Sequence, residues 1–187
     1  MHVTQHAKLP DLLIIEPKHF GDTRGYFFES FQAERYALHG IPATFVQDNC
    51  SRSMKGVLRG LHHQKAHTQG KLIYATRGQI LDVAVDIRQG SPTFGQWAGV
   101  ILDDQNHRQV YIPPGFAHGF CVLSLEADIF YKCTHYYYPA AELTLRWDDP
   151  DVGIEWPIQN PLISVKDQNG KFLKDFNKCD LPIWEKP

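Results

Sequence analysis

His62 and Arg59 are the first residues whose types and spacing indicate chemistry. They belong to the stretch 56–64, GVLRGLHHQ, which begins like a buried strand and contains two adjacent imidazoles. Between Asn49 and Leu81 the chain has no Asp or Glu, but it has six basic residues: Arg52, Lys55, Arg59, Lys65, Lys71 and Arg77. A field of one sign attracts an anion, and an imidazole exchanges protons near neutral pH. The stretch therefore predicts acid–base chemistry on a small anionic ligand. The alternative is an ordinary core strand with a solvated basic edge.

Gly60 lies between these two residues and decides whether they share a site. In a regular strand Arg59 and His62 would face opposite sides, because side chains alternate. A glycine inside a strand is a typical position for a β-bulge, which shifts the alternation by one residue. We therefore expect a bulge at Gly60 if both side chains act together. Otherwise one of them simply faces solvent.

Lys71 and Tyr131 are the next candidates. Lys71 leaves a polar turn and enters an apolar strand, where its ammonium group either neutralises an oxyanion or protects a sheet edge. Tyr131 lies in the middle of a strand. It is either a core aromatic residue with a tethered hydroxyl or an acid–base partner that faces His62 across a cavity. The neighbouring cluster 136–138, three tyrosines, either stacks on a base or sugar ring or packs on the surface.

His118 follows the motif Pro-x-Gly-x-x-His at 113–118, which is how metal-binding cupins position a late metal ligand. A metal site also needs early ligands, usually His-x-His followed by a carboxylate. Here Gln64 stands at the second histidine position, no carboxylate follows before Asp82, and Lys71 adds charge of the wrong sign. The sequence therefore predicts no metal site.

The elements that must position these residues are short strands separated by Gly and Pro. Alternation is clearest at 80–88, where Leu81, Val83, Val85 and Ile87 share one face. Arg77-Gly78-Gln79 before it is typical of a hairpin. Strands at roughly 8–12-residue spacing predict an all-β jelly-roll sandwich with few short helices. The expected strands are 12–15, 26–31, 45–49, 56–64, 71–76, 80–88, 96–102, 109–112, 116–123 and 127–138, with 163–167 as a short strand or edge segment and 32–39 as a helix.

Composition limits the class of protein. The chain has 187 residues, 43% of them hydrophobic and 21% charged, which predicts one packed domain over 1–187 with a C-terminal extension, about 140–187, packed on it. The net charge of -2 gives no reason to expect nucleic acid as a partner. The N-terminus is not a signal sequence, and the apolar run 12–15 is too short to cross a membrane. The four cysteines lack metal or disulfide spacing, which favours free thiols in a reducing cytoplasm: Cys50, Cys121, Cys133 and Cys179.

Taken together, these motifs resemble the dTDP-4-dehydrorhamnose 3,5-epimerase family, whose fold is a cupin jelly roll. The similarity runs through nearly the whole chain in order. Single motifs are short, but their succession is specific. The matching stretches are 20–25, 47–49, 56–62, 69–71, 82–88, 91–95, 112–120, 131–132, 147–150 and 166–167.

The resemblance implies a role for each matching residue. His62 corresponds to the general base, Asp167 to its orienting partner, Tyr131 to the general acid and Lys71 to the group that stabilises an enolate. Further positions correspond to contacts with the nucleotide-sugar: Phe20, Arg24, Glu29, Gln47, Asn49, Arg59, His118, Tyr137, Glu142 and Lys166. The resemblance also implies no cofactor and a homodimer, in which the strand 12–15 pairs across the interface.

The implied substrate is a 4-keto-6-deoxy sugar on thymidine diphosphate. The C3 and C5 protons flank the ketone, so their removal gives an enolate, and reprotonation from the opposite face inverts each centre. This reaction belongs to dTDP-L-rhamnose biosynthesis, which supplies glycans such as the lipopolysaccharide O-antigen. Two positions depart from the family pattern: His63, where an aromatic residue is frequent, and His135, where Asp is frequent. The alternatives are an epimerase that inverts one centre only, a metal-dependent cupin enzyme and a non-catalytic sugar-binding jelly roll.

Overall fold

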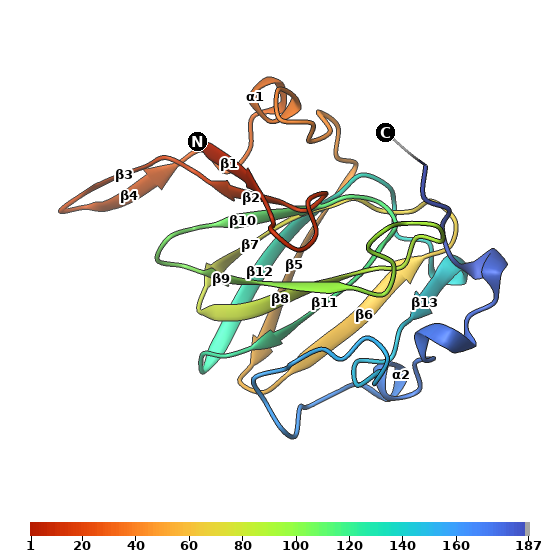
Figure 1. Cartoon of the computed structure of the whole chain (residues 1–187). Coiled ribbons are helices and arrows are strands. Elements are labelled where there is room, and N and C mark those ends of the chain that lie inside the picture. Colours follow the sequence, from red (N-terminus) through yellow and green to blue (C-terminus); the bar gives the residue numbers. More distant parts are fainter. Residues whose placement is uncertain (186–187) are drawn as a thin grey trace.

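Two antiparallel sheets face one another in the computed structural model, which describes residues 1–185 (Figure 1). The six-stranded sheet contains, in spatial order, β1 (His2–Gln5), β2 (Leu13–Glu16), β10 (Gln109–Ile112), β7 (Lys71–Arg77), β12 (Glu126–Cys133) and β5 (Gln47–Met54). The five-stranded sheet contains β13 (Glu142–Thr144), β6 (Leu58–Gln64), β11 (Phe116–Val122), β8 (Gln79–Asp86) and β9 (Trp97–Asp103). The predicted all-β jelly-roll sandwich is confirmed.

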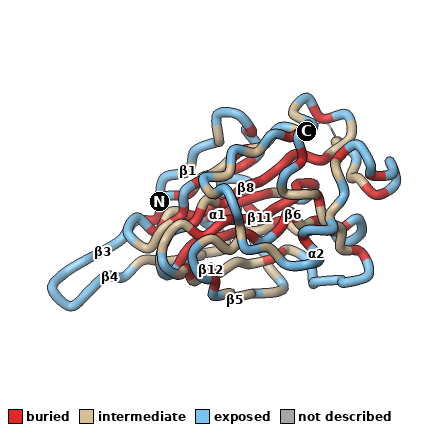
Figure 2. Tube along the Cα trace, turned by 90° about the horizontal axis from the view of Figure 1, so that it is seen from below, coloured by how far each residue is buried: buried red, intermediate tan, exposed pale blue. Residues whose placement is uncertain are grey.

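The main core lies between the sheets, because alternate residues of facing strands point inward. Ala127 and Ile129 of β12 pack in one buried cluster with Ile80 and Ala84 of β8. Tyr131, two residues beyond Ile129, packs against the same cluster. Figure 2 shows the buried stretches along β8 and β11, and β6 beside them is buried at most of its positions. The apolar core therefore fills one end of the sandwich, and the polar side chains that point inward lie at the other end.

The C-terminal segment covers the outer face of the five-stranded sheet. Val83 and Val85 of β8, and Ile87 directly after it, pack there in a second buried cluster with Leu173 and Phe176. Strand β8 is therefore buried on both faces. Besides β13, this part of the chain contains short helical turns: η1 (Pro139–Ala141), α2 (Val165–Gln168), η2 (Leu173–Asp175) and η3 (Lys178–Asp180).

Helix α2 corrects one prediction. The sequence predicted a short strand or edge segment at 163–167, but Val165–Gln168 is helical. The reason is a local cap: the Ser164 hydroxyl accepts a hydrogen bond from the backbone N–H of Asp167 at 3.1 Å. An N-cap serine satisfies an amide that the helix itself leaves free, and this outweighs the extended preference of Ile163 and Val165.

A hairpin arm, β3 (His19–Asp22) and β4 (Gly25–Phe28), extends away from the sandwich (Figure 1). The arm is largely exposed (Figure 2). The strand predicted at 26–31 begins one residue earlier, at Gly25, and ends at Phe28. Helix α1 (Ala33–Ala37) is shorter than the predicted 32–39, because Gln32 is its N-cap and Leu38 its C-cap.

Within residues 1–185, no helix combines the length and the apolar character needed to cross a membrane.

Candidate active site

Gly60 forms the predicted bulge. His62 of β6 pairs with His118 of β11, but Arg59 pairs with Phe120, so the register shifts between these two pairs. The backbone of Gly60 has a φ of 115°. A Cβ atom there would lie 2.6 Å from the Gly119 Cα and 2.7 Å from the His118 carbonyl oxygen. Only glycine fits, and the shift brings Arg59 and His62 to the same cavity.

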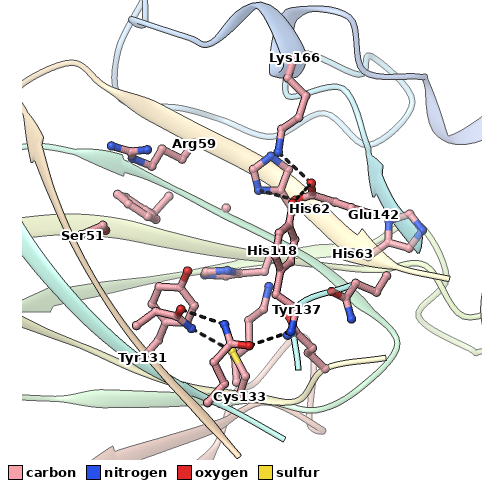
Figure 3. A pocket seen from close by; sticks show the side chains of 17 residues that line it. Ser51, Arg59, His62, His63, His118, Tyr131, Cys133, Tyr137, Glu142 and Lys166 are labelled. Carbon is pink, nitrogen blue, oxygen red and sulfur yellow. Dashed lines mark hydrogen bonds and ion pairs between the residues drawn. The ribbon is translucent and has the colours of Figure 1, made fainter. Parts of the chain in front are cut away.

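That cavity has a volume of about 300 Å³ and opens between the two sheets. Figure 3 shows His62, Glu142 and Lys166 on one side of it and Tyr131 and Cys133 on the other. Most residues that the sequence singled out line it: Gln47, Asn49, Arg59, His62, Lys71, His118, Tyr131, Tyr137, Glu142 and Lys166.

His62 is bound through one ring nitrogen. Its Nε2 lies 2.6 Å from Asp167 Oδ1, and the Asp167 Oδ2 accepts the backbone N–H of Gly60 at 3.1 Å. Burial alone would raise the pKa of the Asp167 carboxyl, but the hydrogen bonds from His62 and Gly60 lower it overall. An ionised carboxylate only accepts, so the His62 Nε2 carries a hydrogen and its Nδ1 is free to accept a proton.

Glu142 lies next to that free nitrogen. Its Oε1 is 3.9 Å from the His62 Nδ1. Its Oε2 accepts two hydrogen bonds, from the Tyr137 hydroxyl at 2.8 Å and from the Lys166 Nζ at 3.1 Å. Burial raises the pKa of the Glu142 carboxyl, but these donors outweigh it and the net shift is downward. The His62 imidazole therefore has one carboxylate beside each of its two ring nitrogens.

Tyr131 and Lys71 approach the cavity from the six-stranded sheet. Burial raises the pKa of the Tyr131 phenol, so the group stays protonated and able to donate. Burial lowers the pKa of the Lys71 ammonium. Lys71 begins β7, which lies between β10 and β12, so it does not protect a sheet edge. An imidazole on one sheet and a phenol on the other can act on opposite faces of a ring held between them.

His118 belongs to a second imidazole–carboxylate pair. Its Nε2 lies 2.8 Å from Asp82 Oδ2, and both residues are buried. Burial lowers the pKa of His118 despite the neighbouring carboxylate. Asp82 was not among the residues predicted for the site. His118 therefore meets the cavity as a neutral ring.

The polar wall beside Tyr131 is ordered by a chain of hydrogen bonds. The Gln47 amide donates to Asn49 Oδ1 at 2.9 Å and accepts the Tyr137 backbone N–H at 2.7 Å. Asn49 Nδ2 lies 3.6 Å from the Cys133 sulfur. Across the cavity, the Arg59 Nε donates to Ser53 Oγ at 2.9 Å, which holds the guanidinium at the rim.

Four predicted residues do not line this cavity. Asp167 reaches the site only through its hydrogen bond to His62. The other three belong to the arm or follow it. Phe20 is on the arm and is 56% exposed. Arg24 is at the tip of the arm and forms an ion pair with Asp22. Glu29 follows the arm and pairs with Arg35. Within one chain they do not meet the other candidates.

Further lining residues were not predicted for the site: Ser51, His63, Gln64, Gln69, Gly119, Phe120 and Cys133. Five of them lie in predicted strands, whereas Gln69 lies in a loop and Ser51 lies beyond the predicted strand 45–49, because β5 continues to Met54. Period-two alternation from Tyr131 could have found Cys133, and the same alternation from Asn49 along a longer strand could have found Ser51. Over residues 1–185, no three His, Cys, Asp or Glu side chains are grouped so that they could hold a metal ion.

Comparison with known proteins gives consistent matches. Residues 6–175 match the family model of dTDP-4-dehydrorhamnose 3,5-epimerase. The dTDP-4-dehydrorhamnose 3,5-epimerase of Pseudomonas aeruginosa is 53% identical over 169 residues, which is 89% of this chain and 93% of that protein. The dTDP-4-dehydrorhamnose 3-epimerase of Streptomyces niveus is 40% identical over 89% of this chain and 82% of that protein. The crystal structure of the Legionella pneumophila dTDP-6-deoxy-D-glucose-3,5-epimerase in complex with dTDP-4-keto-L-rhamnose has a TM-score of 0.96, with 53% identity and 99% of each chain covered.

Proposed function

The chain belongs to the dTDP-4-dehydrorhamnose 3,5-epimerase family of sugar-nucleotide isomerases, and we propose that it inverts C3 and C5 of dTDP-4-dehydro-6-deoxy-D-glucose. The product is dTDP-4-dehydro-L-rhamnose. The observation that carries this proposal is the pair of His62 and Tyr131, which line one cavity from opposite sheets. An enolate formed by a base on one face and reprotonated by an acid on the other has the inverted configuration.

In this proposal His62 takes the C3 or C5 proton on its free Nδ1. Asp167, at 2.6 Å from Nε2, holds the ring orientation and stabilises the imidazolium. Tyr131 delivers a proton to the same carbon from the other side. Lys71 stabilises the negative charge that develops on the C4 oxygen. No step requires a metal ion or another cofactor.

The remaining lining residues are proposed to hold the nucleotide-sugar. Arg59 and Lys166 supply positive charge for the diphosphate. Tyr137 offers an aromatic ring for the thymine, and Gln47, Asn49 and Glu142 offer hydrogen bonds. His118, held neutral by burial, contacts the sugar without adding charge.

We also propose that the protein acts as a homodimer. The prediction that the strand 12–15 pairs across the interface is wrong, because β2 is already hydrogen-bonded to β1 and β10 within the chain. The exposed arm supports the homodimer: Phe20, Tyr26 and Phe27 are 56%, 60% and 68% exposed, and an apolar hairpin of this kind is stabilised by a partner surface. In a dimer the arm would bring Phe20, Arg24 and Glu29 to the partner's cavity. Light scattering should give about twice 21.4 kDa; a persistent monomer would contradict the assembly.

The four free cysteines support a cytoplasmic location. We propose that the product enters dTDP-L-rhamnose biosynthesis and, through it, glycans such as the lipopolysaccharide O-antigen. No nucleic acid or membrane partner is proposed. The whole chain is proposed to act as one domain, with the segment from about residue 140 as its packed extension.

The decisive experiment is turnover of dTDP-4-keto-6-deoxyglucose in deuterated water, followed by proton NMR of the product. Inversion of both centres labels C3 and C5. The second candidate is an epimerase that inverts one centre, which the similarity to the 3-epimerase of Streptomyces niveus favours. It would label and invert one position only. No labelling at either position would contradict both.

A further inference from the structure

One base and one acid cannot invert two centres in succession unless both return to their starting protonation states after the first inversion. After the first inversion His62 holds the proton from the substrate, and Tyr131 has lost its own. The second inversion needs His62 without that proton and Tyr131 with one. Between the two inversions a proton must therefore leave the imidazole, and an equivalent proton must reach the phenolate.

The hydrogen bonds of His62 show by which ring nitrogen the proton can leave the imidazole. Asp167 occupies Nε2 at 2.6 Å, and its side chain is only 4% exposed. Its second oxygen is occupied by the backbone N–H of Gly60. A proton passed to Asp167 would thus have no outlet to water. The proton from the substrate sits on the other nitrogen, Nδ1, and must leave from there.

Glu142 is positioned for that transfer. Its Oε1 lies 3.9 Å from the His62 Nδ1, while Tyr137 and Lys166 both bind Oε2. A rotation that shortens the contact by about 1 Å gives a hydrogen bond, and catalytic contacts are often long without substrate. Figure 3 shows Glu142 between His62 and Lys166. The Glu142 side chain is 15% exposed and that of Lys166 is 52% exposed, so the route runs from the cavity to solvent.

We propose that Glu142 removes the proton from His62 between the two inversions and releases it to bulk water beside Lys166. This inference rests on the proposed double inversion. The N–H bond on Nδ1 breaks, its electron pair stays on the ring, and an O–H bond forms on Glu142 Oε1. That proton then passes to water, and the Tyr131 phenolate takes one proton from water. No charge or electron is gained or lost over the cycle.

The downward pKa shift of the Glu142 carboxyl supports the second half of this step, because a weakly basic carboxylate gives up its proton readily. Its position on β13 supports the first half. Thr144 of β13 pairs directly with His62, so the two strands keep the imidazole and the carboxylate in register.

The test is Glu142→Gln, measured in deuterated water with product NMR. The amide keeps the size and the hydrogen bonds but cannot take a proton. We expect labelling of the first centre within about tenfold of the parent, loss of the second inversion on the order of 10–10²-fold, and release of singly inverted sugar. Added formate or imidazole should restore the second inversion in proportion to its concentration. Glu142→Asp, which keeps a carboxylate, should restore part of it without added buffer.

Glu126→Gln is the matched control, since Glu126 is ion-paired with Arg77 away from the cavity. It should leave both inversions unchanged. If Glu142→Gln slows both inversions equally and no buffer restores them, Glu142 only binds substrate and the relay is wrong. If the parent itself labels one centre only, the double inversion fails, and the relay fails with it for that separate reason.

Discussion

Two imidazole–carboxylate pairs lie side by side on adjacent strands. His62 of β6 pairs in register with His118 of β11. Each uses Nε2 to bind a carboxylate, Asp167 at 2.6 Å in one case and Asp82 at 2.8 Å in the other. Their surroundings differ: the His62 side chain is 26% exposed and that of His118 is 10% exposed. The same kind of imidazole–carboxylate pair thus occurs once in a more exposed position and once in a more buried position.

This difference in burial separates the proposed roles of the two imidazoles. Burial lowers the pKa of His118, so that ring stays neutral and is suited to bind an uncharged sugar. His62 has more contact with solvent, and a second carboxylate, Glu142, lies 3.9 Å from its free nitrogen. We therefore assign proton abstraction to the open pair and substrate positioning to the enclosed pair.

Removing each imidazole is the strongest way to break this comparison. His62→Ala should lower turnover on the order of 10⁴-fold, because it removes the proposed base and neither Glu142 nor His118 occupies its position. It should also abolish exchange of the C3 and C5 protons with deuterated water. His118→Ala should retain exchange. Its kcat/KM should fall less, roughly 10–10²-fold, mainly because KM rises. If His118→Ala abolishes exchange while His62→Ala retains it, the two roles are reversed.

Tyr131→Phe tests the acid on the opposite sheet. The base remains, so deuterium should still enter the substrate, whereas inversion should fall on the order of 10²–10³-fold. Folding should be unaffected, since only one hydroxyl is removed. The measurement is the ratio of labelled substrate to inverted product. If the variant inverts both centres at the parent rate, Tyr131 is a core aromatic residue and the acid lies elsewhere; His118 does not replace it, because His118 lies on the same sheet as His62.

Changing each carboxylate to an amide sharpens the comparison. Asp167→Asn should lower kcat roughly 10²-fold, because an amide stabilises the imidazolium less than a carboxylate does. Asp82→Asn should lower kcat less than about tenfold but should reduce the free energy of unfolding by about 1–3 kcal/mol, the usual effect of disturbing a buried polar pair. Denaturant unfolding and steady-state kinetics on both variants separate the two effects. Equal losses of kcat would mean that both pairs serve the chemistry.

Much of this arrangement could be predicted from local sequence. Gly60 predicted the bulge because only glycine tolerates both its φ and the close approach of the neighbouring strand. Alternation at 80–88 predicted the shared face of Val83, Val85 and Ile87. These features depend on a few neighbouring residues, which is why the sequence was sufficient.

Other features depend on contacts far apart in the chain. His62 and Asp167 are 105 residues apart, and only the family resemblance related them. Asp82 lies on the polar side of an alternating strand, a pattern that does not show that this side faces a cavity inside the sandwich. The helical turn at Val165–Gln168 was not predicted, because Ile163 and Val165 are β-branched and favour extended structure, whereas the structure has an N-cap at Ser164. The position of the arm cannot be predicted from the alternation of its residues, because no local sequence signal identifies the surface that the arm contacts.

His63, next to His62 on the same strand, extends the comparison to an imidazole without a carboxylate. It is 7% exposed, and its Nδ1 has no hydrogen-bond partner among residues 1–185. Its Nε2 lies 3.4 Å from the carbonyl oxygen of Asp180. Burial is the main reason that its pKa falls to about 4, and Lys71 and His62 lower it further, while Asp180 opposes the shift.

This pKa predicts the smallest effect, on stability rather than on activity. In the unfolded chain a histidine takes up a proton near pH 6.5, but folded His63 does so only near pH 4. Below pH 6.5 the unfolded state therefore binds more protons, and the free energy of unfolding falls as the pH falls. Between pH 7 and pH 5.5 His63 should contribute a loss of about 1 kcal/mol. His63→Phe, which fits the aromatic contact with Phe176 at 5.6 Å, should reduce this loss in urea unfolding at the two pH values. A pH dependence that is identical in parent and variant would mean that His63 is protonated equally in both states.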